Sequence, residues 1–351
     1  MAKLRALMIG AGGMAGGWIR HMLPRFSDRM QIVGLCDVVP GVLADAADFL
    51  GLPEDARFLR MEDAFARTEA DFAIIVIPPA HHRDAVVQAA AHGLHILSEK
   101  PIADTWEATC EIYHAVRAAG VKMAVIQNYR YTPRILTLKR VLEEGTIGRP
   151  RYVMARFSAD YRMRGSWGDF RHRIRHSLLV EGGIHHLDQI RNLAGADCEW
   201  IAGMEWNPGH PSFDGESMAQ YVCGMRNGVA GNYEGSCLAA AAQHSWHDEY
   251  YRVECEDGAV SIGRDQIVRV QRHLGGQRLS TEEVAMARSE YEGHQHVING
   301  TLHWLAGGPA PETRLQDNIQ SNAMLFAAIQ ASEERRTVNV QDKLRQAGCL
   351  D

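Results

Sequence analysis

The sequence has no long hydrophobic run and no excess of positive charge. Its longest apolar stretch, from Phe72 to Ala80, is interrupted by Pro78 and Pro79 and falls far short of the ~20 residues that span a bilayer. The 37 lysines and arginines are outnumbered by 43 aspartates and glutamates, whereas a dedicated nucleic-acid-binding protein is normally basic. Glycines interrupt the apolar segment near the N-terminus, which argues against a secretory signal. We therefore expect a cytoplasmic protein with no membrane and no nucleic-acid partner.

The sequence also has no cysteine pair of the C-x-x-C type. Its seven cysteines are scattered and odd in number. Disulfide scaffolds and zinc sites usually show regular cysteine spacing, so we expect reduced thiols that fill the core. The composition, 46% hydrophobic and 23% charged, is that of an ordinary globular enzyme.

A chain of 351 residues predicts about two domains. In the first third, short β-branched runs alternate with longer helical patterns, which is typical of a doubly wound parallel sheet. We expect strands at 4–9, 31–36, 72–77, 95–97 and 123–126, and helices at 14–23, 40–50, 82–91 and 105–119.

Beyond residue 127 the pattern changes to long alternating runs. Asn227-Gly228 and Asp257-Gly258 between such runs are strong hairpin signals. We expect strands within 151–161, 217–225, 229–237 and 251–262, and helices at 133–144, 184–193, 295–305 and 316–332. The predicted fold is an α/β domain over residues 1–127, followed by an α+β domain over residues 128–351 built on a mostly antiparallel, open-faced sheet.

A glycine-rich turn follows the first predicted strand. Gly10-x-Gly12-x-x-Ala15 combines a tight turn with bare backbone at the start of a helix, where a pyrophosphate can approach the amides. Asp37 follows the second strand, at the place where a carboxylate accepts hydrogen bonds from the ribose hydroxyls of NAD. Val38 and Val39, rather than a cation, come next and favour NAD over NADP. We predict a Rossmann domain that binds NAD through Gly10, Gly12, Gly13, Met14 and Asp37.

Two further motifs end strands at the carboxyl edge of this sheet, where open α/β sheets bind ligands. Ile77 and Pro78 end one strand, and His82 follows as either a polar cap or a cofactor contact. Glu99 and Lys100 end the next strand, and Pro101 restricts Lys100 to an extended backbone. A solvated Glu-Lys ion pair is the ordinary alternative.

In sequence order, these motifs resemble the glucose-fructose oxidoreductase, inositol dehydrogenase and rhizopine-catabolism (Gfo/Idh/MocA) family. The first half matches in the glycine-rich turn, Asp37, Pro78-Pro79-x-x-His82, His92-Gly93-x-His95 and Glu99-Lys100-Pro101. The second half matches in Asn128-Tyr129-Arg130-Tyr131-x-Pro133, Glu143-x-Gly145-x-Ile147-Gly148-x-Pro150 and Glu181-Gly182-Gly183-Ile184-His185-His186-Leu187-Asp188. The resemblance implies that Ile77, Pro78, His82, Glu99, Lys100 and Asn128 join the cofactor site. It also implies a homodimer or homotetramer, formed through the open sheet face.

The resemblance assigns the chemistry to His185 and Lys100. In the family, a His or Tyr at the position of His185 takes the proton from the hydroxyl being oxidised, with the Lys of the Glu-Lys-Pro motif alongside. A near-neutral imidazole suits that transfer, and an ammonium stabilises the developing alkoxide. Glu181 and Asp188 are expected to orient the base, although inositol dehydrogenases usually have Asp where this chain has Glu181. Without the resemblance, the alternative to a catalytic His185 is a histidine that lies in the core or caps a helix.

Substrate contacts are expected from Lys100, Glu181 and His185 and from two further groups. The locally basic segment from Arg149 to His176 allows three interpretations: a solvated face, a subunit interface, or a pocket. In the pocket interpretation an aromatic ring stacks on a sugar and an Arg pairs with a carboxylate or phosphate, which selects Arg164, Trp167 and Arg171. Arg130 and Tyr131, with Asn128, contact ligands or form a hinge with a buried tyrosine.

No metal site is expected from the histidine pattern. Glu181 lies four residues before His185, but the glycines between them form helices poorly and no third ligand is evident. We expect none of the histidine pairs His81-His82, His185-His186 and His294-x-His296 to be a metal site either.

These expectations combine into an NAD-dependent dehydrogenase that takes hydride from a secondary hydroxyl of a sugar, polyol or sugar derivative. Two alternatives come from the same family: a redox-neutral, NAD-dependent glycoside-cleaving enzyme, and a non-catalytic NAD(P)-sensing regulator. Retention of both Lys100 and His185 argues against the regulator.

Overall fold

The computed structural model describes residues 2–241 and 246–350. Contacts within the chain divide it into two compact units, Met1–Gln127 with His294–Ile319 and Asn128–Gly293 with Gln320–Asp351. Residues 294–319, which the sequence places in the second domain, thus pack with the first unit. The helix they form contributes to the site described below, because His294 contacts Glu99 there.

The first unit contains a six-stranded sheet with the strand order β3-β2-β1-β4-β5-β6. All of its neighbouring strands are parallel. The strands are β1 (Leu4–Ile9), β2 (Met30–Cys36), β3 (Arg57–Phe58), β4 (Phe72–Ile75), β5 (His95–Ser98) and β6 (Met123–Val125). The strand order reverses between β1 and β4, and such a switch point is where open parallel sheets bind ligands at their carboxyl edge.

Helices and short helical turns connect these strands. They are α1 (Gly13–Gly17), η1 (Trp18–Met22), η2 (Leu23–Phe26), α2 (Pro40–Leu50), η3 (Glu54–Ala56), α3 (Met61–Arg67), η4 (Pro79–His81), α4 (His82–Ala91) and α5 (Trp106–Ala119). Helix α9 (Gly293–Leu305) comes from a later part of the chain and packs with this unit. Helix α5 begins where Thr105 Oγ1 accepts a hydrogen bond from Ala108 N (3.2 Å), and it ends at Gly120 with φ 65°. The single helix predicted at 14–23 is instead α1, the π-helix η1 and the start of η2, where Pro24 lacks the amide that would continue α-helical bonding.

The second unit contains a nine-stranded sheet with the order β14-β13-β12-β11-β7-β10-β9-β8-β15. Its strands are β7 (Pro150–Ser158), β8 (Cys198–Trp206), β9 (Met218–Met225), β10 (Ala230–Ser236), β11 (Tyr250–Cys255), β12 (Gly258–Ile262), β13 (Val268–His273), β14 (Leu279–Glu283) and β15 (Val338–Asn339). Strands β7 and β10 pair in parallel and the other neighbours are antiparallel. The hairpins predicted at Asn227-Gly228 and Asp257-Gly258 join β9 to β10 and β11 to β12, which confirms them.

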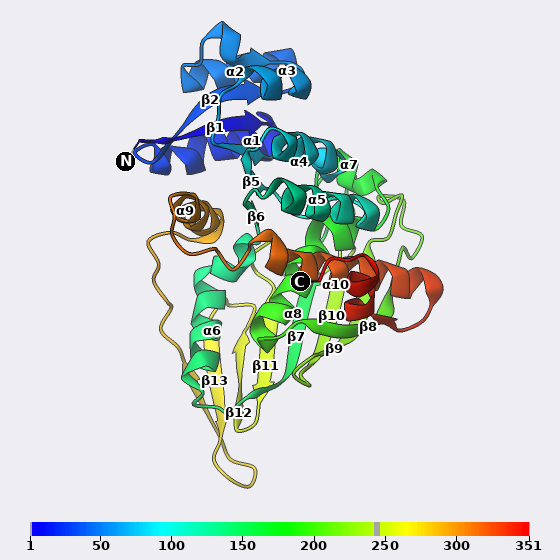
Figure 1. Cartoon of the computed structure of the whole chain (residues 1–351). Coiled ribbons are helices and arrows are strands. Elements are labelled where there is room, and N and C mark those ends of the chain that lie inside the picture. The colour runs from blue at the N-terminus through cyan, green and yellow to red at the C-terminus, as the bar shows by residue number, and fades with distance from the viewer. Residues whose placement is uncertain (1, 242–245, 351) are drawn as a thin grey trace. The chain divides into compact units, whose positions relative to one another are not determined.

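The helices and helical turns of this unit are η5 (Asn128–Tyr131), α6 (Pro133–Glu144), α7 (Asp169–Arg173), η6 (Leu178–Gly183), α8 (Ile184–Ala194), α10 (Leu315–Glu334) and α11 (Val340–Gln346). Helices α6, α8 and α11 cover one face of the second sheet (Figure 1). Helix α8 packs on β7 and β10, and α11 packs on β8. On the other face, Trp200, Met204 and Val222 are 39%, 53% and 48% exposed. The predicted fold class, a Rossmann sheet and a mostly antiparallel open-faced sheet, is confirmed.

Each unit has its own apolar core. Trp18, Phe26 and Phe72 are fully buried in the first unit, and Phe157 and Tyr233 are fully buried in the second. Over residues 2–241 and 246–350, no helix combines the length and the apolar character that crossing a bilayer requires.

Candidate functional site

The glycine-rich turn joins β1 to α1. Gly10 has φ 102°, and a Cβ at this position would lie 2.2 Å from the carbonyl oxygen of Val76. Gly12 precedes α1, where Gly13 has φ 51° and Met14 is exposed. Position 10 accepts only glycine, because both the backbone conformation and the available space exclude a side chain. The turn therefore presents bare backbone at the carboxyl end of β1.

Asp37 follows β2 and contacts this turn. Its Oδ2 accepts hydrogen bonds from the amides of Ala11 (2.8 Å) and Gly12 (3.3 Å), and its Oδ1 accepts one from Val39 N (2.9 Å). Val38 and Val39 are 79% and 49% exposed. The structure thus brings Gly12 and Asp37 together, and the surface next to the carboxylate is apolar.

Glu99 follows β5 and is almost fully buried. Its Oε1 accepts a hydrogen bond from Trp18 Nε1 (3.2 Å) and lies 3.3 Å from His294 Nε2, while Lys100 N donates to its Oε2 (3.3 Å). Burial acts to raise the pKa of Glu99, but the hydrogen bond and charge of His294, with Lys100, outweigh it and the net pKa is lowered. Glu99 is thus a fixed carboxylate that anchors the backbone of Lys100.

His82 links the loops that follow β4 and β5. Its Nε2 lies 2.9 Å from the carbonyl oxygen of Ile77 and its Nδ1 lies 2.9 Å from that of Pro101. The imidazole is fully buried, and this burial lowers the pKa of His82 although the two carbonyls act in the opposite direction. His82 therefore connects Ile77 to the Glu99-Lys100-Pro101 segment, a role that neither sequence interpretation described.

His185 is the second residue of α8, directly after the π-helix η6. It is 6% exposed. A Cβ on Gly182 would lie 2.7 Å from the ring of Trp246, and one on Gly183 would lie 2.9 Å from Leu179 Cδ2. The two glycines therefore let neighbouring side chains pack against the backbone just before His185.

The ring of Tyr129, in η5, stacks on the imidazole of His185. The ring centroids are 4.1 Å apart and the planes differ by 9°. Burial, followed by the charge of Glu249, raises the pKa of Tyr129 well above its ordinary value, so its phenol stays neutral. The stack defines the plane of the imidazole. Sequence reasoning named the neighbours of Tyr129 as site residues and missed Tyr129 itself, because a tyrosine in a buried hinge gives no distinct signal.

Asp188 lies one turn beyond His185 and binds Arg130. Arg130 Nε donates to Asp188 Oδ2 (2.8 Å) and Nη2 donates to Oδ1 (2.6 Å), and Ser321 Oγ also donates to Oδ1 (2.5 Å). Arg130 and Asp188 are 5% and 1% exposed. This buried pair fastens η5, which carries Tyr129, to α8, which carries His185. The geometry supports a positioning role for both residues.

Glu181, in η6, is paired with Arg171 of α7. Arg171 Nε donates to Glu181 Oε2 (2.7 Å), and its guanidinium lies 4.4 Å from the ring centroid of Phe170 and 5.6 Å from that of Trp167. Arg171 is thus held by a carboxylate and by aromatic faces at once.

Trp167 belongs to a cluster of stacked aromatic rings. Its ring centroid lies 5.3 Å from Tyr161 and 5.2 Å from Trp246, and Trp246 lies 4.6 Å from Phe157. Arg164, by contrast, is 40% exposed and binds Asp214 through two hydrogen bonds of 3.0 and 2.8 Å. The structure therefore gathers Trp167, Arg171 and Glu181 in one neighbourhood. Asn128 and Tyr131 are buried at 3% and 6% exposure.

Comparison with known proteins agrees with this geometry. Residues 4–127 match the model of the oxidoreductase family with an NAD-binding Rossmann fold, and residues 135–261 match the GFO/IDH/MocA C-terminal domain. The chain is 36% identical to the uncharacterized protein y4oX of Sinorhizobium fredii, over 97% of each chain. It is 26% identical to D-apiose dehydrogenase of Paraburkholderia graminis, over 97% of this chain and 90% of that protein.

The fold is also shared with solved structures. One is an oxidoreductase from Agrobacterium radiobacter in complex with NAD+, L-tartaric acid and magnesium, with a TM-score of 0.82 and 21% identity over 97% of this chain and 99% of that one. The two family models follow each other along the chain and together match most of it. The protein belongs to the Gfo/Idh/MocA family of NAD-binding oxidoreductases.

Proposed function

We propose that this NAD-binding oxidoreductase is a dehydrogenase that removes hydride from a secondary hydroxyl of a sugar, polyol or sugar derivative. The observation that carries the proposal is the buried His185 imidazole, stacked on Tyr129 and placed on a helix that the Arg130–Asp188 pair holds. A full-length relative named D-apiose dehydrogenase supports a sugar-like substrate.

The residues around the glycine-rich turn fit a dinucleotide. Gly12 and Gly13 leave the start of α1 without side chains, a Cβ on Gly13 would meet open space, and Asp37 offers a carboxylate next to the turn. We propose that Gly10, Gly12, Gly13, Met14 and Asp37 hold NAD, with Ile77, Pro78, His82, Glu99, Lys100 and Asn128 completing its site. Bound NAD supplies the hydride acceptor. Because Val38 and Val39 are exposed beside Asp37, a 2′-phosphate would meet a carboxylate and no cation among these residues, and NAD should bind more tightly than NADP.

In this proposal, His185 takes the proton of the reacting hydroxyl. Its Nδ1 is buried, so Nε2 is the nitrogen that we assign to the transfer. Lys100 stabilises the oxygen as its proton leaves, because an ammonium at a dry site favours developing negative charge. Asp188 acts through Arg130 and Tyr129 to hold the imidazole plane.

The neighbourhood of Glu181 suits a sugar-like substrate. Aromatic rings stack on the apolar face of a sugar ring, and the aromatic cluster that includes Trp167 lies near the Arg171–Glu181 pair. We propose that Trp167, Arg171, Glu181 and Tyr131 contribute to substrate binding. Arg130 is buried and bound to Asp188, which favours a structural role for it. Arg164 is paired with Asp214 and is 40% exposed, so its side chain can still reach a ligand, and we propose it as a further substrate contact.

The test is the absorbance of reduced nicotinamide, recorded with the protein, NAD and a panel of free sugars, inositols, anhydrosugars, sugar acids and glycosides. The proposal expects the signal to grow with one class, and to grow less when NADP replaces NAD. Glycoside cleavage without accumulated NADH would instead establish redox-neutral chemistry. Bound NAD without turnover on any class would contradict the dehydrogenase proposal.

We further propose that the open face of the second sheet joins two copies of the chain. Trp200 and Met204 on β8 and Val222 on β9 form an exposed apolar strip, and such strips on soluble proteins mark interfaces. Light scattering of the parent chain should give a dimer or tetramer. Met204→Glu with Val222→Lys should reduce the mass, and an unchanged mass would place the interface elsewhere.

A further inference from the structure

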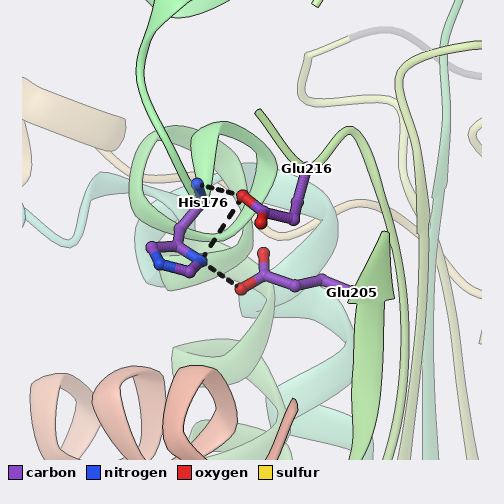
Figure 2. A group of neighbouring side chains, drawn as sticks. All are labelled: His176, Glu205 and Glu216. Atoms are coloured by element: carbon purple, nitrogen blue, oxygen red, sulfur yellow. Dashed lines mark hydrogen bonds and ion pairs between the residues drawn. The ribbon is translucent and has the colours of Figure 1, made fainter. Parts of the chain in front are cut away.

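Three titratable side chains outside the proposed catalytic residues come together in the second unit. His176, Glu205 and Glu216, here called the His176 cluster, each offer one ligand atom within 4.8 Å of the other two (Figure 2). His176 Nδ1 lies 2.5 Å from Glu205 Oε1 and 3.6 Å from Glu216 Oε2. The residues come from the turn before η6, the end of β8 and the segment that leads into β9.

One carboxylate oxygen of this cluster is buried without a donor. Glu205 is 6% exposed, and its Oε2 has no hydrogen-bond partner among the described residues. Figure 2 shows the Glu205 carboxylate turned toward that of Glu216. A buried carboxylate oxygen without a donor is unfavourable, and a second carboxylate facing it adds repulsion. A cation between the two carboxylates would offset the repulsion and reduce the cost of burying the Glu205 charge.

The surroundings add little positive charge to the cluster. Glu333 Oε1 lies 3.7 Å from His176 Nε2 and brings a third carboxylate. Arg175 Nη2 lies 3.8 Å from Glu216 and 3.1 Å from Glu333, but its side chain is 68% exposed, so solvent screens it strongly. Three carboxylates therefore surround one imidazole.

We propose that the His176 cluster binds one divalent transition-metal ion, and that Zn²⁺ is the ion it fits best. Zinc accepts both imidazole nitrogens and carboxylate oxygens as ligands, whereas Mg²⁺ prefers oxygen ligands alone. Three ligands from the chain leave a fourth position for water.

The observed spacings are close to those of a zinc site. Bonds of about 2.0 to 2.2 Å place tetrahedral donors roughly 3.4 Å apart. The separation of His176 Nδ1 from Glu216 Oε2, 3.6 Å, already matches that value. The contact from Nδ1 to Glu205 Oε1, at 2.5 Å, has to widen by about 1 Å. Nδ1 coordinates only when deprotonated, so metal binding replaces this hydrogen bond and releases a proton if Nδ1 carries one.

The backbone already holds the ligands in place. A Cβ on Gly215 would lie 2.4 Å from the carbonyl oxygen of Ile174, so the two segments pack directly against each other. His176 N donates to Glu216 Oε2 (2.8 Å), and Glu205 N donates to Ser332 Oγ (3.0 Å). A bound ion would link the turn before η6 to strands β8 and β9. The elements that follow this turn, η6 and α8, carry Glu181 and His185. The histidine spacing in the sequence does not reveal this set, and the proposal replaces the expectation of no metal.

The test is equilibrium dialysis of the full chain, stripped with a chelator, against Zn²⁺, with bound metal measured by mass spectrometry. The parent chain should bind one Zn²⁺ at micromolar or lower concentration, and Mg²⁺ at least tenfold more weakly. His176→Gln and Glu205→Gln should each weaken Zn²⁺ binding at least tenfold. Glu199→Gln, on the same strand β8 but partly exposed, is the matched control and should leave the affinity unchanged.

Glu216→Gln covers the case in which Glu205→Gln fails to fold, because Glu216 is less buried. It too should weaken binding at least tenfold, with a circular dichroism spectrum like that of the parent. Zn²⁺ should also raise the thermal midpoint of the parent and not of these variants. The proposal would be overturned if the parent binds no stoichiometric Zn²⁺, or if the parent and all three cluster variants bind it with equal affinity. The cluster would then be held together by a shared proton instead of a metal ion.

Discussion

The ring of Tyr129 lies parallel to the imidazole of His185, with the ring centroids 4.1 Å apart. An aromatic face at this distance fixes the plane of the imidazole while its edge stays available for proton transfer. The Arg130–Asp188 pair joins the segments that carry the two rings. Placement of the His185 imidazole is therefore a property of η5 and α8 together.

Replacing Tyr129 tests this relationship. Tyr129→Leu should lower kcat by about tenfold to 10²-fold, because loss of the stack lets the imidazole leave the productive geometry. Tyr129→Phe keeps the stack and should retain most of the turnover. Steady-state kinetics and NAD affinity of both variants check this, and equal kcat in Tyr129→Leu and the parent would show that the stack has no positioning role.

The cofactor turn offers a matched pair of glycines. Gly10→Ala puts a Cβ 2.2 Å from the carbonyl oxygen of Val76 at φ 102°, whereas Gly13→Ala at φ 51° meets no atom within 4 Å. Gly13→Ala should cost about 1 kcal/mol of unfolding free energy from backbone conformation alone. Gly10→Ala should cost more and weaken NAD binding at least tenfold. Denaturant unfolding and NAD titration measure both effects, and similar losses in the two variants would contradict the steric reason.

The buried Arg130–Asp188 pair predicts a large stability effect. Asp188→Asn leaves the Arg130 guanidinium without its carboxylate and should cost about 3 to 5 kcal/mol. The double variant Arg130→Met with Asp188→Leu should recover much of that stability, because both members of the pair are removed and the neighbouring Arg191 keeps its ion pair with Asp197. Urea unfolding of the single and double variants measures the difference. A double variant as unstable as Asp188→Asn would show that packing, rather than charge, is lost.

Glu99 predicts a pH-dependent contribution to stability. Its net pKa in the folded chain lies below the ordinary value of 4.5. The carboxylate therefore stabilises the fold above pH 4.5, and this contribution is lost as the pH falls through the lowered pKa. Glu99→Gln should be less stable than the parent at neutral pH, and the difference should shrink on acidification. Unfolding at several pH values tests this, with the exposed Glu107→Gln as control, and a constant difference would contradict the linkage.

Much of the fold could be predicted because individual residues indicate where its helices and strands begin and end. Pro40 at the start of α2, Gly120 after α5 and the Asn227-Gly228 turn each specify a boundary within the chain itself. Strands β3 and β15 were missed because two residues each carry no periodicity. The packing of residues 294–319 with the first unit was also missed, because the apolar face of a helix does not indicate which of two cores it packs against.

The sequence predicted the tight turn at Gly10 and the helix that carries His185, because a glycine pattern and a helical spacing are local signals. The candidate site was not predictable where the partner comes from a distant segment. Asp188 was expected to orient His185, and its oxygens bind Arg130 and Ser321. His294, Tyr129 and the His176 cluster likewise depend on contacts between segments far apart in the sequence.

The most direct test of the central claim is the turnover of His185→Ala with the substrate that the nicotinamide panel identifies. Loss of a positioned base should lower kcat by about 10² to 10⁴-fold while the dissociation constant of NAD stays within twofold of the parent. His21→Ala, an exposed histidine of the first unit, should match the parent in both measurements. Parental turnover in His185→Ala would contradict the assignment of His185 as the general base.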